Sequence, residues 1–169
     1  MTDASAYEVR DSPSVLRVVQ VLQEQQVRGA VTILDEHART ARLAADQLGI
    51  DIGQIANSLI FRAHLPDGTI TPLLVLASGA HRVDTVHVAD TLGLDQITRA
   101  DADFVREHTG FAIGGVPPVA HRTPPLTVVD IALSRYKKVW AAAGHPRAVF
   151  PTSYNELLRL TGGQSAEVA

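Results

Sequence analysis

Few residues in this chain have the type and spacing that catalysis or metal binding requires. Cysteine is absent from the 169 residues, which excludes disulfides, thiolate metal sites and a cysteine nucleophile. The seven histidines suggest zinc, but no two of them lie three or four residues apart on a predicted helix. A Gly-x-Ser-x-Gly nucleophile elbow is also missing. We therefore expect neither a metal nor an organic cofactor.

Four features remain that could form a site. Asn57-Ser58 interrupts an apolar strand, Asp130 ends another strand, and Gly144-His145-Pro146 follows a third. The fourth is a glycine loop near residue 114. A buried polar side chain needs a hydrogen-bond partner or a ligand, which favours a site. The alternatives are a solvated strand edge for Asn57-Ser58, a helix cap for Asp130 and a surface turn for His145.

The glycine loop runs from Thr109 to His121. An apolar run, Phe111 to Ile113, stops at Gly114-Gly115, and Val116 then leads into Pro117-Pro118. Glycine permits backbone angles closed to other residues, and proline fixes the exit from the turn. No side chain covers the peptide N–H groups at the glycines, so the loop could offer them to a ligand. On composition alone, a tight connection between two buried strands is the favoured alternative.

Short helices and strands alternate along the chain and must position these features. This alternation predicts one mixed α/β (α+β) domain over residues 12–163, with a flexible N-terminus at 1–11 and a flexible tail at 164–169. The first predicted helix begins at Pro13 and is stopped by Gly29. Further helices are predicted after the caps Thr40, Asp84, Asp101 and Ser153, and Ser153 forms a capping box with Glu156. A turn of helix is predicted over 131–138, and strands are predicted over 30–34, 55–63, 70–77, 126–131, 139–143 and 148–150.

Composition limits the classes of partner. A hydrophobic content of 46% with 20% charged residues is typical of a globular protein, and no apolar run is long enough to span a bilayer. The N-terminus carries no basic-then-apolar signal, so we expect a cytoplasmic protein without a membrane partner. The net charge of −3 argues against a broad basic face for DNA or other nucleic acid, although it allows binding to the end of an RNA.

Several segments together resemble the YbaK/EbsC family, which is also the insertion-domain editing module of bacterial prolyl-tRNA synthetases. The resemblance rests on the Thr109–Pro118 signature and holds over residues 30–162. It implies a curved mixed sheet, nearly a barrel, flanked by helices. The other matching segments are Gln54–Phe61, Leu73–Leu76, Arg82-Val-Asp84, Ala100-Asp101, Val128-Val-Asp130 and Trp140–His145.

The resemblance also implies an activity. Family members hydrolyse the ester of a mischarged tRNA, typically proline tRNA carrying a small wrong amino acid, and free-standing members act in trans. The partners implied are the tRNA acceptor end and prolyl-tRNA synthetase. A ribose hydroxyl of the tRNA, or a water that it positions, is thought to replace a protein nucleophile. The loop amides of Gly114, Gly115 and Val116 would hold the carbonyl. Contacts to the substrate would come from Ser58, Pro117, Pro118, Asp130, Gly144 and His145, with Val116 and Pro117 excluding larger side chains.

One position departs from the family pattern. Asn57 stands where the family strand usually carries a lysine, which is thought to hold the terminal phosphate or ribose of the tRNA. Loss of an ammonium group at a phosphate contact weakens binding. Three outcomes follow: a nearby arginine replaces the lysine, the substrate differs, or the protein binds without hydrolysing. The candidate arginines are Arg62, Arg82 and Arg122.

Overall fold

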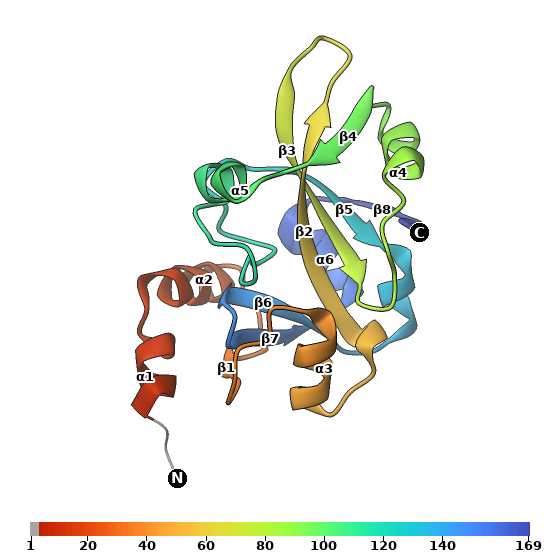
Figure 1. Ribbon diagram of the computed structural model, residues 1–169. Helices are drawn as coiled ribbons and strands as arrows, with labels where there is room; N and C mark the ends of the chain where they lie inside the picture. The colour runs from red at the N-terminus through yellow and green to blue at the C-terminus, as the bar shows by residue number, and fades with distance from the viewer. Residues whose placement is uncertain (1–3) are drawn as a thin grey trace.

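One eight-stranded mixed sheet forms the centre of the molecule, with helices packed around it (Figure 1). The computed structural model describes residues 4–169. The strands are β1 (Thr32–Ile33), β2 (Ile55–His64), β3 (Ile70–Ser78), β4 (Gln96–Arg99), β5 (Leu126–Asp130), β6 (Val139–His145), β7 (Ala148–Thr152) and β8 (Gln164–Ala166). The helices are α1 (Ala4–Arg10), α2 (Pro13–Glu24), α3 (Ala41–Leu48), α4 (Thr85–Leu92), α5 (Ala102–Thr109), α6 (Tyr154–Thr161) and the 3₁₀ turns η1 (Ile52–Gln54) and η2 (Ile131–Arg135).

Strand β2 is the junction of the sheet. The strand order is β1-β7-β6-β2-β3-β5-β8, and β4 pairs with the far end of β2. Strand β2 is antiparallel to β3 along its whole length, from Ala56 opposite Ser78 to His64 opposite Ile70. Its pairing with β6 is parallel and involves only Ile55 and Ala56. The two halves of the sheet are therefore joined by a very short ladder.

The core lies on both faces of β3. Its five residues from Leu73 to Ala77 are fully buried, as the run of aliphatic residues predicts for a central strand. On one face, Leu74 and Leu76 pack with Val129 of β5 and Phe150 of β7 in the largest hydrophobic cluster. On the other face, Val75 packs against Val88 of α4.

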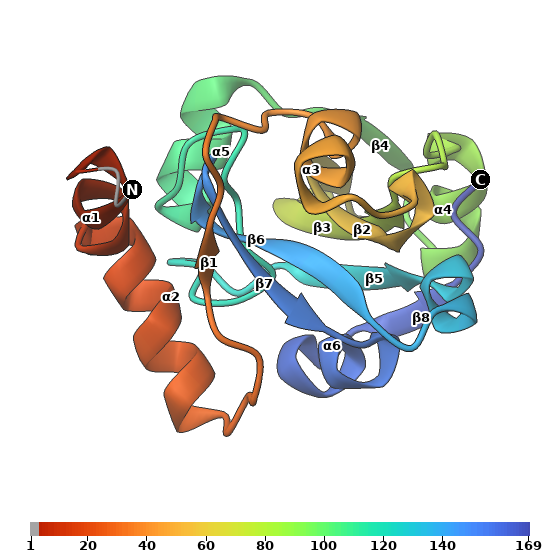
Figure 2. The same cartoon turned by 90° about the horizontal axis from the view of Figure 1, so that it is seen from below.

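The sheet curves so that its two halves face each other across the larger cluster. In Figure 2, β6 and β7 lie over the part of the sheet that contains β5. Because residues of β3, β5, β6 and β7 share one core, the sheet encloses its side chains much as a barrel does. The predicted fold class, a single mixed α/β domain with a curved mixed sheet flanked by helices, is confirmed.

Local capping chemistry sets the helix boundaries. The side chains of Thr40, Asp84 and Asp101 each accept a hydrogen bond from the backbone three residues on. Four helices end at a glycine in the left-handed conformation, where other residues are disfavoured. The glycines are Gly49, Gly93, Gly110 and Gly162.

One predicted helix boundary is wrong. Helix α2 ends at Glu24 and not at Gly29, whose role is instead to let the chain pass close to β7. A Cβ on Gly29 would lie 2.1 Å from the Pro151 carbonyl oxygen. The capping box of α6 is only half formed, because Ser153 accepts from the Glu156 amide while the Glu156 carboxylate accepts from the Thr152 hydroxyl at 2.7 Å.

Both chain ends contain secondary structure that was not predicted from the sequence. Helix α1 occupies most of the predicted flexible N-terminus, and its Val9 packs into the main core. Residues 1–3 of that segment lie outside the described residues. The predicted flexible tail, 164–169, instead adds β8 to the edge of β5 and buries Val168 completely. Neither the packing of α1 nor the pairing of β8 was predicted, because both segments are mostly polar and a single apolar residue anchors each of them.

The glycine loop connects α5 to β5 and does not join two strands, as composition alone favoured. Phe111 is buried, whereas Ile113 is half exposed. Strand β4, which pairs antiparallel with Phe61 to His64 of β2, was not predicted from the sequence. Within residues 4–169, no helix is long and apolar enough to cross a membrane.

Candidate functional site

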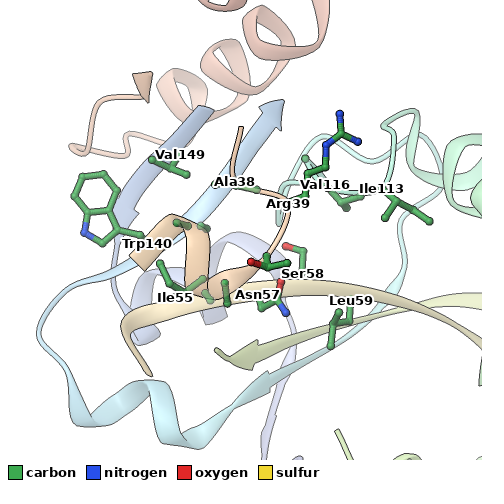
Figure 3. Close-up of a pocket in the computed structure, with 18 residues that line it drawn as sticks. Ala38, Arg39, Ile55, Asn57, Ser58, Leu59, Ile113, Val116, Trp140 and Val149 are labelled. Atoms are coloured by element: carbon green, nitrogen blue, oxygen red, sulfur yellow. The ribbon is translucent and has the colours of Figure 1, made fainter. Parts of the chain in front are cut away.

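A pocket of about 270 Å³ opens where β2 separates from β6 (Figure 3). The strands part after Ala56, so Asn57 and Ser58 are the first residues of β2 without a partner on the β6 side. The segments 38–44 and 113–116 close the space from across the strand. Apolar side chains form most of its walls, including Ile55, Leu59, Val116, Trp140 and Val149.

The edge of β2 that faces this pocket has free backbone groups. In an antiparallel ladder, the N–H and C=O of alternate residues point to opposite neighbours. The Ile55 carbonyl accepts from Gly79 N on the β3 side, and the His64 carbonyl accepts from Asp95 N on the β4 side. The backbone groups of Ser58 and Ile60 must therefore point away from β3. Between the β6 and β4 ladders, no strand within residues 4–169 pairs with them.

Ser58 and Asn57 both line the pocket, as predicted. The Ser58 hydroxyl is buried, yet it has no hydrogen-bond partner in the described part of the chain. No hydrogen bond is formed by the Asn57 side chain within residues 4–169 either. A buried polar group without a partner costs about 1–3 kcal/mol, which a ligand with a matching group would offset. The solvated-edge alternative fails for Ser58.

The glycine loop lies opposite β2, and Gly114, Gly115 and Val116 line the pocket as predicted. Gly114 adopts a φ of 95°, which favours glycine. A Cβ on Gly115 would lie 2.9 Å from the backbone nitrogen of His145, so only glycine fits this close approach. The loop is fixed there, because Gly144 N donates to the Gly115 carbonyl at 2.9 Å.

Two of the three loop amides form no hydrogen bond in the described part of the chain. Gly115 N–H donates to the Ala112 carbonyl at 3.3 Å and is partly used by the turn. The N–H groups of Gly114 and Val116 have no acceptor among residues 4–169. A pair of free amides beside a small cavity can hold an oxygen that gains negative charge. The expectation that the loop amides are bare therefore holds for Gly114 and Val116 and is wrong for Gly115.

His121 holds the far end of this loop. Its Nε2 donates to the Pro117 carbonyl at 2.6 Å, since a carbonyl can only accept. Its Nδ1 is buried without a partner among the described residues. Burial is the main cause that lowers the pKa of His121, the charge of Arg17 acts in the same direction, and the hydrogen bond to Pro117 opposes both.

We expect His121 to make the fold less stable in acid. With a folded-state pKa below the unfolded value of about 6.5, its contribution is complete above that pH and is lost as the pH falls towards the folded value. In urea unfolding at pH 7.5, 6.0 and 5.0, the difference in unfolding free energy between wild type and His121→Gln should shrink as the pH falls. The exposed His87→Gln serves as control. A constant difference for His121→Gln would contradict the prediction.

Basic groups gather on the side of the pocket formed by residues 37–39. Arg39 lines the pocket, and the His37 and His145 rings have centroids 5.5 Å apart. Burial is the main cause that lowers the pKa of His145, and the charges of His37, Arg147 and Arg39 lower it further. His145 itself contributes its backbone to the support of Gly115, while its Nδ1 accepts from Arg147 N at 3.0 Å.

The three arginines predicted to replace the missing lysine lie outside the pocket. Arg62 forms an ion pair with Asp101 at 3.3 Å and stacks on the Phe104 ring. Arg122 donates to the Glu107 carbonyl at 3.3 Å. Arg82 is exposed between β3 and α4 and is not part of the lining. The proposal that one of these arginines serves the pocket has no support in its geometry.

Asp130 also lies outside the pocket. The alternative interpretation, that Asp130 caps a helix, is confirmed. The side chain accepts from Ala132 N at the start of η2 and from Ser78 N, both at 2.9 Å. His81 Nδ1 lies 2.8 Å from the same oxygen that Ser78 contacts. With 1% of its surface exposed, Asp130 cannot reach the amino group of a ligand bound beside Ser58.

Three other residues predicted to contact the substrate, Pro117, Pro118 and Gly144, lie outside the pocket. Pro117 and Pro118 are buried, and Pro118 lines a separate cavity beside α2. Gly144 anchors Gly115 and adopts a φ of 98°. None of the three residues lines the pocket, so Val116 alone of the predicted pair can exclude larger side chains.

The wall formed by residues 38–44 was not predicted from the sequence. Thr40 caps α3 as predicted, by accepting from Leu43 N at 3.2 Å, but it also lines the pocket together with Arg39. Trp140 was likewise not predicted to line it. The sequence did show an arginine directly before a helix cap. That pattern alone could not predict a pocket residue, because only the tertiary fold brings Arg39 opposite β2.

No side chain of the pocket can act as a base. Two hydroxyls, those of Ser58 and Thr40, line it, but within residues 4–169 no histidine or carboxylate does. A hydroxyl without an adjacent base is a poor nucleophile at neutral pH. Nor do three or more potential metal ligands lie together in the described part of the chain. The arrangement can hold a carbonyl and exclude large groups, while proton transfer must come from water or from the ligand.

This geometry defines a mixed α/β domain whose central strand opens onto a small, mostly apolar pocket beside a glycine loop. Residues 35–160 match the family described as the aminoacyl-tRNA editing domain. The match covers well over half of the chain, which therefore belongs to this family. The resemblance to the YbaK/EbsC family is confirmed.

Three similar proteins place the chain within the family. It is 30% identical over 127 residues to the uncharacterized protein YwhH of Bacillus subtilis (strain 168), covering 75% of this chain and 78% of that protein. It is 29% identical over 93 residues to the proline–tRNA ligase of Limosilactobacillus fermentum (strain NBRC 3956 / LMG 18251), covering 55% of this chain but only 16% of the ligase. A crystal structure described as a candidate trans-editing enzyme for prolyl tRNA synthetase is 42% identical, with a TM-score of 0.83 and coverage of 93% and 97%.

Proposed function

We propose that this protein is an aminoacyl-tRNA deacylase that acts in trans on a mischarged tRNA. The observation that carries the proposal is the pocket between Ser58 and the Gly114–Val116 loop, with two free amides and a buried hydroxyl without a partner. Family membership supplies the class of substrate. The expected substrate is proline tRNA carrying a small wrong amino acid, in line with the relatives named for proline tRNA ligase and prolyl tRNA synthetase.

The reaction is the hydrolysis of one ester bond. Water attacks the carbonyl carbon, the bond from that carbon to the ribose oxygen breaks, and the ribose oxygen leaves as a hydroxyl group. The amides of Gly114 and Val116 hold the carbonyl oxygen as it becomes negative, a contribution of about 3 kcal/mol for each donor in comparable acyl transfers. Because no base lines the pocket, the free ribose hydroxyl, or a water that it orients, moves the proton.

Pocket size selects small amino acids. Val116 and Ile55 are fixed in the core and cannot yield to a larger side chain without moving the loop or β2. A steric contact of this kind discriminates by about 10- to 200-fold for each methylene group. The Ser58 hydroxyl offers a hydrogen bond to the amino group or to a polar side chain of the substrate.

The direct test is a panel of mischarged tRNAs. Purified protein is incubated with proline tRNA carrying alanine, cysteine or serine, and loss of the ester is followed against the rate without enzyme. We expect at least one of these esters to be hydrolysed faster than correctly charged prolyl-tRNA. If none is hydrolysed above the background rate, the protein is not a deacylase. The second candidate would then hold, a protein that binds tRNA 3′ ends, aminoacyl groups or a synthetase, which Asn57 in place of a lysine favours.

Asn57→Lys should strengthen tRNA binding. A new ammonium group at the mouth of the pocket adds one charge-assisted contact with phosphate, worth about 1.5–3 kcal/mol, or roughly tenfold or more in affinity. Affinity for an uncharged acceptor-stem RNA measures the effect without hydrolysis. Val86→Lys, at a position 71% exposed on α4, adds the same charge away from the pocket and should change affinity little. Equal gains for both variants would show that position 57 does not face the RNA.

A further inference from the structure

Arg39 is the charged side chain in the lining of the pocket, and it is exposed to solvent. It is the only Lys, Arg, Asp or Glu in the lining formed by residues 4–169. Its stem lies against the glycine loop, with Cγ 3.4 Å from the position that a Cβ on Gly114 would occupy. Its guanidinium group forms neither an ion pair nor a hydrogen bond with any other residue in that range. Figure 3 shows the stem of Arg39 beside Val116 and its guanidinium group pointing away from Ser58, at the rim of the pocket.

The backbone that carries Arg39 is fixed on both sides. Ala38 N donates to the Pro146 carbonyl at 2.8 Å, and Leu34 N donates to the Arg147 carbonyl at 2.6 Å. Immediately after Arg39, Thr40 caps α3. A cation whose main chain is held in place loses less conformational entropy when it binds a ligand, so this position is suited to recognition.

The imidazole rings of His37 and His145 lie beside Arg39, with their centroids 5.5 Å apart. His145 lies close enough to His37, Arg147 and Arg39 for the charge of each to act on it. Neither His37 nor His145 pairs with a carboxylate within the described residues. The Arg39 guanidinium has no carboxylate partner among the described residues, and such an unpaired cation creates a positive potential that an anion relieves. An aminoacyl ester carries no negative charge, so this potential suits another part of the ligand, the phosphodiester backbone of the RNA.

We propose that Arg39, with His37 and His145 beside it, forms a phosphate-binding subsite for the 3′-terminal nucleotides of the RNA. This inference rests on the proposed function and adds to it. Arg39 approaches the pocket from the side opposite β2, so the positive charge that Asn57 does not supply comes from across the cavity. The planar guanidinium can contact two oxygens of one phosphate, which also fixes the orientation of the terminal nucleotide.

The test measures binding of an uncharged acceptor-stem RNA over a range of salt concentrations. Arg39→Gln should weaken binding by about tenfold, the loss of one charge-assisted contact, and should reduce the slope of log K against log salt by about 0.7 to 0.9. Arg39→Lys should retain the slope. Arg42→Gln is the matched control, because Arg42 is exposed on α3, three residues further along the chain, and does not line the pocket. Thermal melting checks that each variant is folded.

A neutral methylphosphonate at the last internucleotide linkage of the RNA identifies the partner of Arg39. Wild type should lose affinity for this RNA, whereas Arg39→Gln should lose nothing further, so the two changes are not additive. Additive losses, or unchanged binding by Arg39→Gln at every salt concentration, would overturn the subsite. If wild type hydrolyses no ester but still binds RNA through Arg39, the proposed function fails and the subsite stands. If hydrolysis is present and Arg39→Gln binds and reacts as wild type, the subsite alone fails.

Discussion

Gly115→Ala is expected to reduce ester hydrolysis by about 100-fold or more, the range found when one carbonyl-holding donor is lost. The backbone angle at Gly115 is accessible to alanine, so the obstacle is space. The added methyl group would lie 2.9 Å from His145 N and 3.0 Å from His145 C, both of which are backbone atoms. The loop must therefore move away from β6, which breaks the hydrogen bond from Gly144 N and displaces the free amides of Gly114 and Val116.

The control for Gly115→Ala is a glycine substitution far from the pocket. Gly68 lies at the tip of the β2–β3 hairpin with a φ of 88°, and a methyl group added there would meet no atom within 4 Å. Gly68→Ala therefore costs about 1 kcal/mol through the backbone alone. Single-turnover hydrolysis at saturating enzyme separates catalysis from binding. If Gly115→Ala is folded and reacts as fast as Gly68→Ala, the loop does not hold the carbonyl.

Asp130→Ala is expected to lower the unfolding free energy by about 3–5 kcal/mol. The substitution leaves two buried backbone amides, those of Ser78 and Ala132, without an acceptor, and each such loss costs about 1–3 kcal/mol. It also removes the anchor of His81. Urea unfolding measures this loss. Asp84→Ala provides the comparison, since an exposed helix cap is worth only about 1 kcal/mol.

The same variant separates a structural role of Asp130 from a substrate contact. At a temperature where Asp130→Ala is still folded, its rate of ester hydrolysis for each folded molecule should equal that of wild type. A specific loss of hydrolysis with unchanged stability would instead show that the carboxylate reaches the substrate. The buried hydrogen bonds of Asp130 favour the structural result.

The sequence predicted the helices and the fully buried strand well, because their signals are local. Thr40, Asp84 and Asp101 precede helices and cap them, and the aliphatic run of β3 is buried on both faces. Strand β4 was missed, since Gln96–Arg99 has little apolar character and pairs only because β2 extends beyond β6. The C-terminal strand was missed for a similar reason: its position depends on the exposed edge of β5.

The site was only partly predictable. Asn57, Ser58 and the Gly114–Val116 loop meet as the family resemblance implied, since glycines and strand polarity are visible in the sequence. The short β2–β6 ladder that opens the pocket depends on how two distant strands pair. For the same reason, the sequence suggested Arg62, whose charge is used by Asp101, and not Arg39, which comes from a loop 18 residues before Asn57.

The most direct test is the structure of the protein with a non-hydrolysable substrate analogue, an alanyl group joined by an amide bond to the 3′ position of adenosine. We expect the analogue to lie between β2 and the glycine loop, with its alanyl side chain against Val116 and its carbonyl oxygen within hydrogen-bond distance of Gly114 N or Val116 N. Binding at another place, such as the cavity beside His81 and Asp130, would contradict the assignment of this pocket as the editing site.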